Sequence, residues 1–416
     1  MGSGRTPSRW ARWSLQAGVT MRSDGGSRWL ILAVLFLART AMGFQFQAVA
    51  ALSSFVVADL KIDYTRLGLL IGLYLLPGVV IAYPGGLLGQ HFGDKRIAIL
   101  GMALMVAGGL ATAITGDFAI VAAGRLVSGA GAVLLNVLLT KMATDWFIGR
   151  EIGTALGVLV SSWPIGIGVA LVVLPWLALH ISPAAAFAGT AAAAAAVLVL
   201  IALVYRAPPA TAAAPPDKGR ARLSGAEIGL TSLAGGVWML FNVGYILVVS
   251  FVPALLTSRG LSAQEAGFVT SLVAWTVIVT IPLGGVLIDR VGHASALMIA
   301  SFIVLGIATA LVPAAPSLAL MTFVGAVVGL PCGAMMVLPA EVLRPQTRSA
   351  GMGVFYTWYY VGMALLVPAA GVLRDASGSA GAPLWFAGAL VLAAMAVLLL
   401  FRVFQRRARA AGEIGS

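Results

Sequence analysis

Residues 29–47 read WLILAVLFLARTAMGFQFQ, an apolar run of membrane-spanning length that carries one arginine. A helix needs roughly 20 apolar residues to cross a bilayer and rises about 1.5 Å per residue, so Arg39 is expected about 15 Å inside the span. A charge at that depth costs at least about 2.5–3.5 kcal/mol. We therefore expect Arg39 to face a bundle interior or a wet cavity, either bonded to neighbouring carbonyls for packing or contacting a bound molecule. Arg39, Gly43 and Gln47 recur every four residues and share one helical face.

The composition predicts an all-α polytopic membrane protein. Of 416 residues, 60% are hydrophobic and 10% are charged, whereas soluble domains carry about 25% charged residues. The single cysteine, Cys332, excludes an internal disulfide and a Cys-rich metal site. Neither a metal-ligand cluster nor a nucleophile–base pair is evident in the sequence. We expect no metal, no cofactor and no enzymatic activity.

The hydropathy of the chain, together with the Gly, Pro and charged residues that interrupt its apolar runs, predicts twelve transmembrane helices. Their approximate residue ranges are 29–57, 67–89, 96–115, 118–144, 152–179, 183–204, 228–257, 265–288, 294–313, 316–342, 348–372 and 382–403. The Pro/Ala-rich segment 206–226 reads as a flexible cytoplasmic linker. The predicted organisation is a basic tail (1–28), an N-terminal six-helix bundle (29–205), the linker, a C-terminal six-helix bundle (227–404) and a second tail (405–416). The first span is too long for a cleaved signal peptide, and Met21 is an alternative start.

The positive charges are distributed asymmetrically. Of 26 Lys and Arg residues, Arg39 and Arg125 fall within spans and four fall on the side opposite the termini, which leaves 20 on the side of the termini. Those four are Lys61, Arg66, Arg259 and Arg374. This asymmetry predicts that both termini are cytoplasmic in a bacterial-type inner membrane. The net charge of +12 therefore indicates contact with anionic headgroups of the lipid bilayer, not with nucleic acid.

The two halves of the chain repeat. The stretch GGLLGQHFG at 85–93 ends the second span, and GGVLIDRVG at 284–292 ends the eighth, 199 residues later. The segments 157–166 and 353–362, in the fifth and eleventh spans, correspond at an offset of 196 residues. Duplicated halves related by an axis along the membrane normal are an architecture of secondary transporters.

Two sequence motifs of this chain resemble those of a known protein family. The loop signature Gly-x-Leu-x-Asp-Arg-x-Gly is intact at 285–292 and degraded at 86–93, and Arg125 opens the Gly-rich stretch RLVSGAGA of the fourth span. Over residues 28–404 the chain thus resembles the major facilitator superfamily. The resemblance implies twelve helices in two pseudo-symmetric six-helix bundles, alternating access and a monomer. Residues 39–47 and PAEVLRP at 339–345 also resemble the bacterial cyanate/nitroimidazole-type porter branch.

The loop signature predicts a conformational latch on the cytoplasmic side. Asp289 is expected to lie against the positive N-terminal end of a helix in the other half, and Arg290 is expected to reach Glu341. In the first half Gln90 stands in place of the aspartate, so its contact towards the eleventh span, with Asp145 nearby, should be weaker. Such contacts form when one side is closed and break when it opens.

A charge census of the spans predicts the substrate class. All 14 Asp and Glu and all three His fall in loops, tails or helix ends, and only Arg39 and Arg125 fall within spans. Buried charges need partners, and arginine stays protonated. The simplest missing partner is a transported small organic or inorganic anion, held by bidentate hydrogen bonds. Arg125 belongs to a signature shared by transporters of many substrates and is expected to be structural or coupled to gating, so Arg39 is the predicted main ligand.

The census of charged groups also bears on how transport is coupled to an energy source. Without a titratable side chain in the pathway, uniport, exchange or a proton carried with the substrate is expected in preference to a side-chain relay.

Other polar side chains complete the predicted site, and for each of them both helix packing and ligand contact are open. These candidates are Gln47, Asn136, Trp163, Asn242, Tyr245, Trp275, Tyr356 and Tyr359. The alternative function is export of neutral drug-like or nitroimidazole-type compounds through an aromatic-lined site. A further alternative is a sensor or a membrane enzyme that has the fold of a transporter.

Overall fold

The computed structural model describes residues 9–114, 116–147, 151–208, 222–344, 346–412 and 414. The side chains of residues 9–27, 82–87, 90, 153, 289, 291 and 349 lie outside this description. The described chain is helical. Its helices are α1 (Arg9–Ala51), α2 (Ser53–Leu60), α3 (Tyr64–Leu73), α4 (Gly78–Phe92), α5 (Asp94–Ala113), α6 (Phe118–Phe147), α7 (Ile152–His180), α8 (Pro183–Val204), α9 (Gly225–Ser258), α10 (Ala263–Val291), α11 (Ala294–Leu311), α12 (Leu318–Gly329), α13 (Cys332–Val337), η2 (Leu338–Glu341), α14 (Arg348–Ser377) and α15 (Ala382–Ala410).

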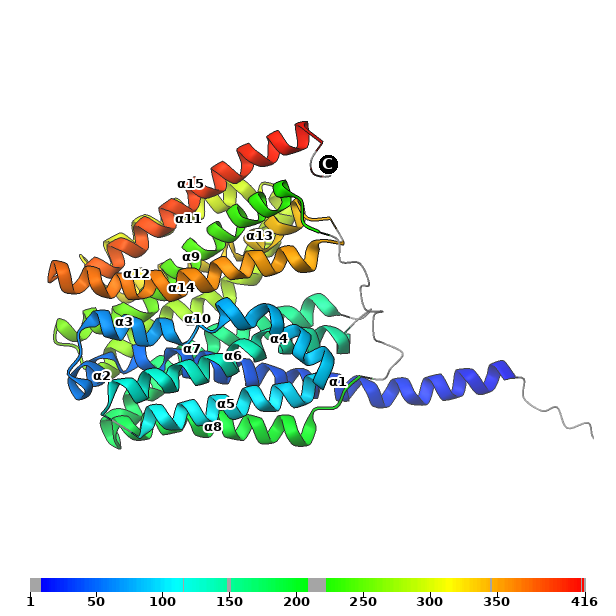
Figure 1. The fold of residues 1–416 in the computed structure, drawn as a ribbon, viewed down its shortest axis with the longest axis horizontal. Helices are drawn as coiled ribbons and strands as arrows, with labels where there is room; N and C mark the ends of the chain where they lie inside the picture. The colour runs from blue at the N-terminus through cyan, green and yellow to red at the C-terminus, as the bar shows by residue number, and fades with distance from the viewer. Residues whose placement is uncertain are drawn as a thin grey trace, which may run out of the picture.

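Twelve helical segments within the described residues are long and apolar enough to cross a membrane, which confirms the predicted number. They begin and end close to the residues expected from hydropathy. The basic tail predicted for residues 1–28 is helical from Arg9, as the first part of α1. This part projects beyond the bundle (Figure 1).

Three of the predicted spans are not continuous helices. The first is divided at Leu52 into α1 and α2, and the second is divided between α3 and α4. Pro77 lies in this second break, where a residue without a backbone N–H cannot continue the hydrogen-bond ladder. The tenth span consists of α12, α13 and η2, with Pro331 at one junction and Pro339 in the last element.

The helices form two sets, α1–α8 and α9–α15, each of which supplies six membrane-spanning segments. In the first set α1 packs against α7, and α5 packs against α6 and α8. In the second set α9 packs against α14 and α15, and α10 packs against α12. The main contacts between the sets join α3 to α14 and α7 to α10, and Figure 1 shows α14 running beside α3.

Glycines allow these inter-set contacts to be close. A Cβ built on Gly371 of α14 would lie 2.1 Å from the carbonyl oxygen of Tyr64, at the start of α3. A Cβ on Gly267 of α10 would lie 2.0 Å from the carbonyl oxygen of Leu171 in α7. Any larger residue would force these backbones apart, so the two glycines fix the approach of the sets at one end of the molecule.

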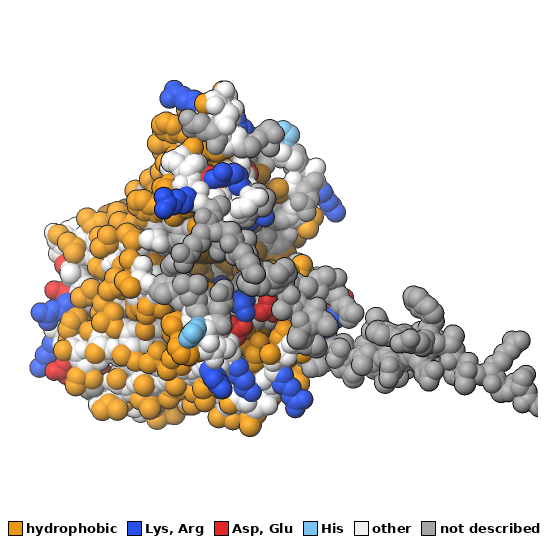
Figure 2. Space-filling model, turned by 45° about the vertical axis from the view of Figure 1, so that its right-hand side comes forward, with side chains coloured by type: hydrophobic (Ala, Val, Ile, Leu, Met, Phe, Trp, Pro, Cys, Tyr) orange, Lys and Arg blue, Asp and Glu red, His pale blue; other side chains and the backbone are white. Residues whose placement is uncertain are grey.

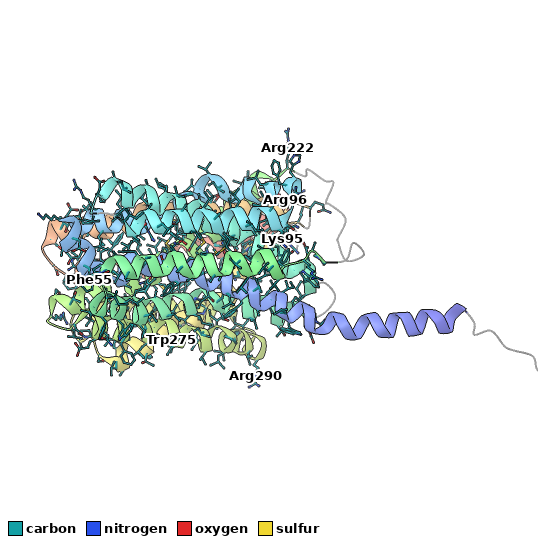
Figure 3. The ribbon with its side chains drawn as sticks, turned by 90° about the horizontal axis from the view of Figure 1, so that it is seen from below. Phe55, Lys95, Arg96, Arg222, Trp275 and Arg290 are labelled. Atoms are coloured by element: carbon teal, nitrogen blue, oxygen red, sulfur yellow. The ribbon has the colours of Figure 1, made fainter. Side chains whose placement is uncertain are left out.

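The molecule has an apolar flank between two charged ends (Figure 2). Figure 3 shows Lys95, Arg96, Arg222 and Arg290 at the end where α1 enters the bundle, and Phe55 at the other end. We call the first end the termini side and the other the opposite side. The close approaches of Gly371 and Gly267 are on the opposite side, because Tyr64 and Gly267 lie near the starts of helices that begin there.

Candidate functional site

Arg39 lies halfway along the membrane-spanning part of α1, Arg28–Ala51, and lies close to side chains of the second set of helices. Its guanidinium interacts electrostatically with Tyr356, Tyr359 and Tyr360, which are all on α14. Its Nε atom is buried without a hydrogen-bond partner. Within the described part of the chain, Arg39 forms no ion pair with a carboxylate. The charge is therefore placed against tyrosines that belong to the other half of the molecule.

Three tyrosines of α14 lie around this charge, and Tyr245 of α9 lies beside one of them. The rings of Tyr359 and Tyr360 pack edge to face, with centroids 5.1 Å apart. Tyr245 of α9 lies close to Tyr359, and its buried hydroxyl has no hydrogen-bond partner among the described residues. We call Arg39, Tyr245, Tyr356, Tyr359 and Tyr360 the central cluster. It combines one fixed positive charge with aromatic surface and hydroxyl groups, which are features of small-molecule sites.

Two hydrogen bonds connect the helix sets close to the central cluster. Gln47 of α1 is fully buried and donates from Nε2 to the Val249 carbonyl of α9 at 2.7 Å, while its Oε1 has no partner. Asn136 of α6 donates from Nδ2 to the Tyr360 hydroxyl at 3.3 Å. Both predicted side chains therefore bridge the two halves, a role that the sequence did not indicate.

Among the described residues Arg125 has no acidic partner, and backbone carbonyls satisfy its guanidinium instead. It is 2% exposed and donates three hydrogen bonds to backbone carbonyls. Its Nε reaches Leu70 at 3.0 Å, and its two terminal nitrogens reach Gln45 and Phe46 at 2.9 Å each. The guanidinium also lies 4.5 Å from the centre of the Tyr74 ring. Of the two roles expected for Arg125, the geometry fits the structural one, which joins α1, α3 and α6.

Three other predicted site residues contact different partners. Trp163 packs against Phe46 with ring centroids 5.4 Å apart. Asn242 donates from Nδ2 to the Trp238 carbonyl at 2.8 Å, one turn earlier in α9. Trp275 is 37% exposed and lies over Gly168, at the contact between α7 and α10. Figure 3 shows Trp275 part-way along the bundle.

Trp238 and Tyr360, two further polar groups of the spans that the sequence places near mid-depth, lie beside or within the central cluster. Trp238 stacks on Phe355 with centroids 6.0 Å apart, Phe355 packs against Tyr356, and the Trp238 Nε1 is buried without a partner. Tyr360 is 3% exposed and belongs to the central cluster. The sequence pointed to both residues. Trp238, Asn242 and Tyr245 recur at i, i+4 and i+7 along α9, and Tyr360 directly follows Tyr359.

The predicted contact between Arg290 and Glu341 is not formed in this structure. Glu341 forms an ion pair with Arg402 of α15 and accepts a hydrogen bond from Gln405 at 2.8 Å, while Arg290 is exposed. Glu341 is the last residue of η2, at the end of the tenth span, and its carboxylate is occupied by partners on α15. The side chains of Gln90 and Asp289 lie outside the described residues.

Asp145 belongs to an ion-pair network within the first set. Lys141, one turn earlier in α6, lies 3.1 Å from Asp145 and also contacts Asp94 at the start of α5. The other ion pairs recorded on the termini side, Arg28–Glu151, Arg344–Glu227 and Arg402–Glu341, likewise each stay within one set.

On the opposite side, by contrast, polar contacts cross between the sets. Asp375 at the end of α14 accepts hydrogen bonds from the backbone N–H groups of Tyr64 at 3.2 Å and Thr65 at 2.7 Å. The Thr65 hydroxyl donates to the same carboxylate at 2.7 Å. Arg374 lies over the Tyr64 ring, 3.3 Å from its centroid. The opposite side is therefore closed by α3 and α14.

Comparison with known families decides what kind of protein has this geometry. The sequence profile described as "Major Facilitator Superfamily" matches residues 31–251 and 233–415, which together span most of the chain. The chain belongs to the major facilitator superfamily. It is a multi-pass membrane transporter of small molecules and not an enzyme.

Similar curated members of the superfamily have stated substrates. The lysosomal dipeptide transporter MFSD1 of Danio rerio is 24% identical over 403 residues, which cover 89% of this chain and 86% of the relative. The human protein of the same name is 25% identical over 401 residues, covering 90% and 86%. The 3-(3-hydroxy-phenyl)propionate transporter of Escherichia coli is 27% identical over 301 residues, covering 64% and 67%.

Solved structures of the major facilitator superfamily share the fold. A bacterial homologue of the human lysosomal transporter Spinster, in an inward-facing and unoccupied conformation, matches with a TM-score of 0.70 and 16% identity over 94% of this chain and 99% of that one. The inward-open xylose transporter XylE from E. coli matches with a TM-score of 0.74 and 15% identity over 90% and 96%. These likenesses confirm the predicted fold.

Proposed function

We propose that this chain is an alternating-access secondary transporter of a small organic anion that carries a carboxylate, and that Arg39 is the main substrate ligand. The transporter would act as a monomer in a bacterial-type cytoplasmic membrane, with both termini in the cytoplasm. The excess of Lys and Arg on the termini side supports this orientation.

One contrast between the two arginines within the spans carries the anion proposal. Arg125 donates to three backbone carbonyls and lies against an aromatic ring, so its charge is compensated by the protein itself. Arg39 has a buried Nε without a partner and faces tyrosines instead of an acid. A buried charge is costly unless it is paired and hydrogen-bonded. A bound carboxylate would supply both to Arg39 through two parallel hydrogen bonds.

Arg39 also lies where a bound substrate could link the two halves of the protein. It extends from α1 of the first set towards α14 of the second, so a substrate held between Arg39 and the tyrosines would contact both sets. Such a bridge favours the state in which the two sets approach each other around the ligand. The closed opposite side supports an inward-facing state. Among the described residues, the ion pairs on the termini side each stay within one set, which supports the same state.

The names of the relatives support a carboxylate substrate. A dipeptide has a terminal carboxylate, and 3-(3-hydroxy-phenyl)propionate is a carboxylate that also carries an aromatic ring. The tyrosines of the central cluster could pack against a ring or a peptide side chain while Arg39 binds the acid.

A neutral aromatic cargo is the second candidate. It is favoured by the aromatic character of the central cluster and by the unpaired Nε1 of the adjacent Trp238. The predicted resemblance to the cyanate/nitroimidazole-type porter branch belongs to this alternative. In this case Arg39 would shape the site without bonding the cargo.

A ligand-stability screen followed by transport assays tests the proposal. Purified protein is melted in the presence of 3-(3-hydroxyphenyl)propionate, dialanine, glucuronate, xylose and a neutral nitroimidazole, because a bound ligand raises the melting temperature. The stabilising compound is then used in counterflow with proteoliposomes. We expect a carboxylate to stabilise the protein and the neutral compounds not to.

The Arg39 variants decide the role of the guanidinium. Arg39→Ala should abolish counterflow, and Arg39→Lys should retain part of it because the bidentate fork is lost while the charge remains. Arg222→Gln, which removes an exposed arginine on the termini side, is the control and should transport normally. Near wild-type transport of the carboxylate by Arg39→Ala, at normal expression, would refute the proposal. Stabilisation by the nitroimidazole alone would favour the neutral cargo.

A further inference from the structure

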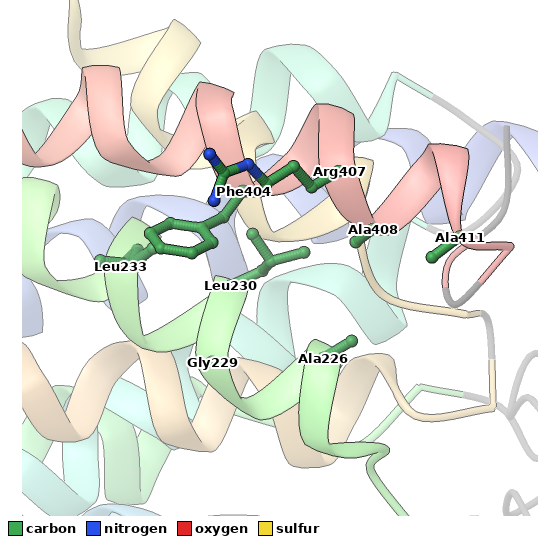
Figure 4. Close-up of a pocket in the computed structure, with 8 residues that line it drawn as sticks. All are labelled: Ala226, Gly229, Leu230, Leu233, Phe404, Arg407, Ala408 and Ala411. Atoms are coloured by element: carbon green, nitrogen blue, oxygen red, sulfur yellow. The ribbon is translucent and has the colours of Figure 1, made fainter.

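A groove of about 400 Å³ opens on the termini side between the start of α9 and the end of α15. Figure 4 shows its lining. The lining residues are Ala226, Gly229, Leu230, Leu233, Phe404, Arg407, Ala408 and Ala411. We propose that this groove binds one anionic phospholipid, with an acyl chain between α9 and α15 and the phosphate on Arg407. This site is separate from the central cluster and does not depend on what the transporter carries.

The apolar part of the groove exists because small residues line it. A Cβ built on Gly229 would meet no atom within 4 Å, so the space beside α9 is open at this position. Leu230 and Leu233 form one wall from α9, and Phe404, which is 46% exposed, forms the other from α15. The volume falls within the usual range of small-molecule sites. An alkyl chain would cover this surface without leaving polar groups unpaired.

The exposed surface around the groove identifies its surroundings as lipid. Leu399, Leu400 and Val403 of α15 are 46%, 49% and 45% exposed. This apolar face is followed directly by Arg406 and Arg407. An apolar helix face that ends in arginines is typical of a span that leaves the hydrocarbon for the headgroup region. The groove therefore lies where an acyl chain meets its headgroup.

Arg407 supplies the charge that selects an anionic lipid. Its guanidinium lies 5.7 Å from the centre of the Phe404 ring, and within the described part of the chain it forms no ion pair with an acid. Arg402, five residues earlier in α15, is instead paired with Glu341. Arginine at a groove entrance on the membrane surface suits a phosphate, to which it can donate two parallel hydrogen bonds. Figure 4 shows Arg407 above Phe404 and the leucines of α9.

The test uses the full chain, purified in detergent and given phosphatidylglycerol, phosphatidylcholine with the same acyl chains, or inorganic phosphate. Bound lipid is counted by native mass spectrometry, and the melting temperature is recorded in parallel. We expect phosphatidylglycerol to raise the melting temperature by about 2–4 °C more than phosphatidylcholine does. Inorganic phosphate alone should have no effect.

Two variants separate the charge from the groove. Arg407→Gln should weaken phosphatidylglycerol binding about fivefold and leave phosphatidylcholine binding unchanged. Gly229→Leu should fill the groove and remove the tightly bound lipid, although Arg407 is still present. Arg222→Gln and Gly225→Leu are matched controls, since Gly225 also has open space around it but does not line the groove.

The outcomes that overturn the proposal are distinct. Equal stabilisation of the wild-type protein by the two lipids, or an equal effect of inorganic phosphate alone, would exclude an anionic phospholipid site. Unchanged phosphatidylglycerol binding in Arg407→Gln would exclude Arg407 as the headgroup contact. If Gly229→Leu does not fold, the Arg407→Gln variant decides, because it changes only an exposed side chain.

Discussion

Asp375, at the end of α14, accepts a hydrogen bond from the backbone N–H of Thr65, at the start of α3, over 2.7 Å. The first N–H groups of a helix have no partner within that helix. At α3 they are satisfied from two directions, since the preceding Asp63 accepts from Arg66 at 2.8 Å and Asp375 reaches across from the other half. The acid also lies at the positive end of the helix dipole, which stabilises it there. This contact must break before the opposite side can open.

Removing this cap should shift the protein towards opening of its opposite side. A lost N-terminal cap is worth about 1 kcal/mol, so Asp375→Ala should increase the population opened on this side about fivefold. Hydrogen–deuterium exchange should be faster at the start of α3 and also at residues 263–270, near the α7–α10 contact, which Asp375 does not touch. Asp59→Ala, which removes another exposed acid on the same side, is the control. Faster exchange confined to α3 would show that the cap stabilises only its own helix.

The only cysteine of the chain should report on the central cluster without any engineered label. Cys332 is partly buried, donates from its thiol to the Val328 carbonyl at 3.3 Å and lies near Tyr245. A membrane-impermeant maleimide should therefore label it slowly, and faster from the termini side than from the opposite side. A bound carboxylate substrate should slow the labelling further, and Arg39→Ala should remove this protection. Protection that persists in Arg39→Ala would place the substrate elsewhere.

The two arginines within the spans should respond to substitution in opposite ways. Arg125→Ala leaves the carbonyls of Leu70, Gln45 and Phe46 without their donors, and should lower stability by about 3 kcal/mol or more. Arg39→Ala removes a charge that the protein does not pair, so it should keep or raise the melting temperature while transport is lost. Melting curves of the two variants in one detergent check this. A large loss of stability in Arg39→Ala would indicate a structural role instead.

Loss of the hydrogen bond between Asn136 and Tyr360 should change the transport rate without changing the fold. Tyr360→Phe removes the hydroxyl that Asn136 contacts at 3.3 Å but keeps the ring. The loss of about 1 kcal/mol corresponds to roughly a fivefold change in transport rate. Thr357→Val on the same helix is a matched control, because its hydroxyl bonds only to the Gly353 carbonyl of α14. If Tyr360→Phe and Thr357→Val transport equally, the bridge to α6 has no part in the cycle.

Much of the central cluster was within reach of sequence reasoning. Arg39 stands out because it is a charge within an apolar run, and the tyrosines stand out because the eleventh span has the same position in the repeat as the fifth. What the spacing could not reveal was the rotation of each helix against its neighbours. Gln47 and Asn136 therefore became bridges between the sets, and Trp275 packs over Gly168.

The sequence by itself determined the membrane class, the twelve spans and the depth of Arg39, because apolar length and charge are local properties of the chain. Only the tertiary structure decided which partners the charged groups have. Arg125 is compensated by carbonyls from residues 45, 46 and 70, Glu341 pairs with Arg402, and Asp375 caps a helix that begins more than 300 residues earlier. Such pairings depend on how helices distant in sequence pack together, and local patterns of hydropathy carry no information about that.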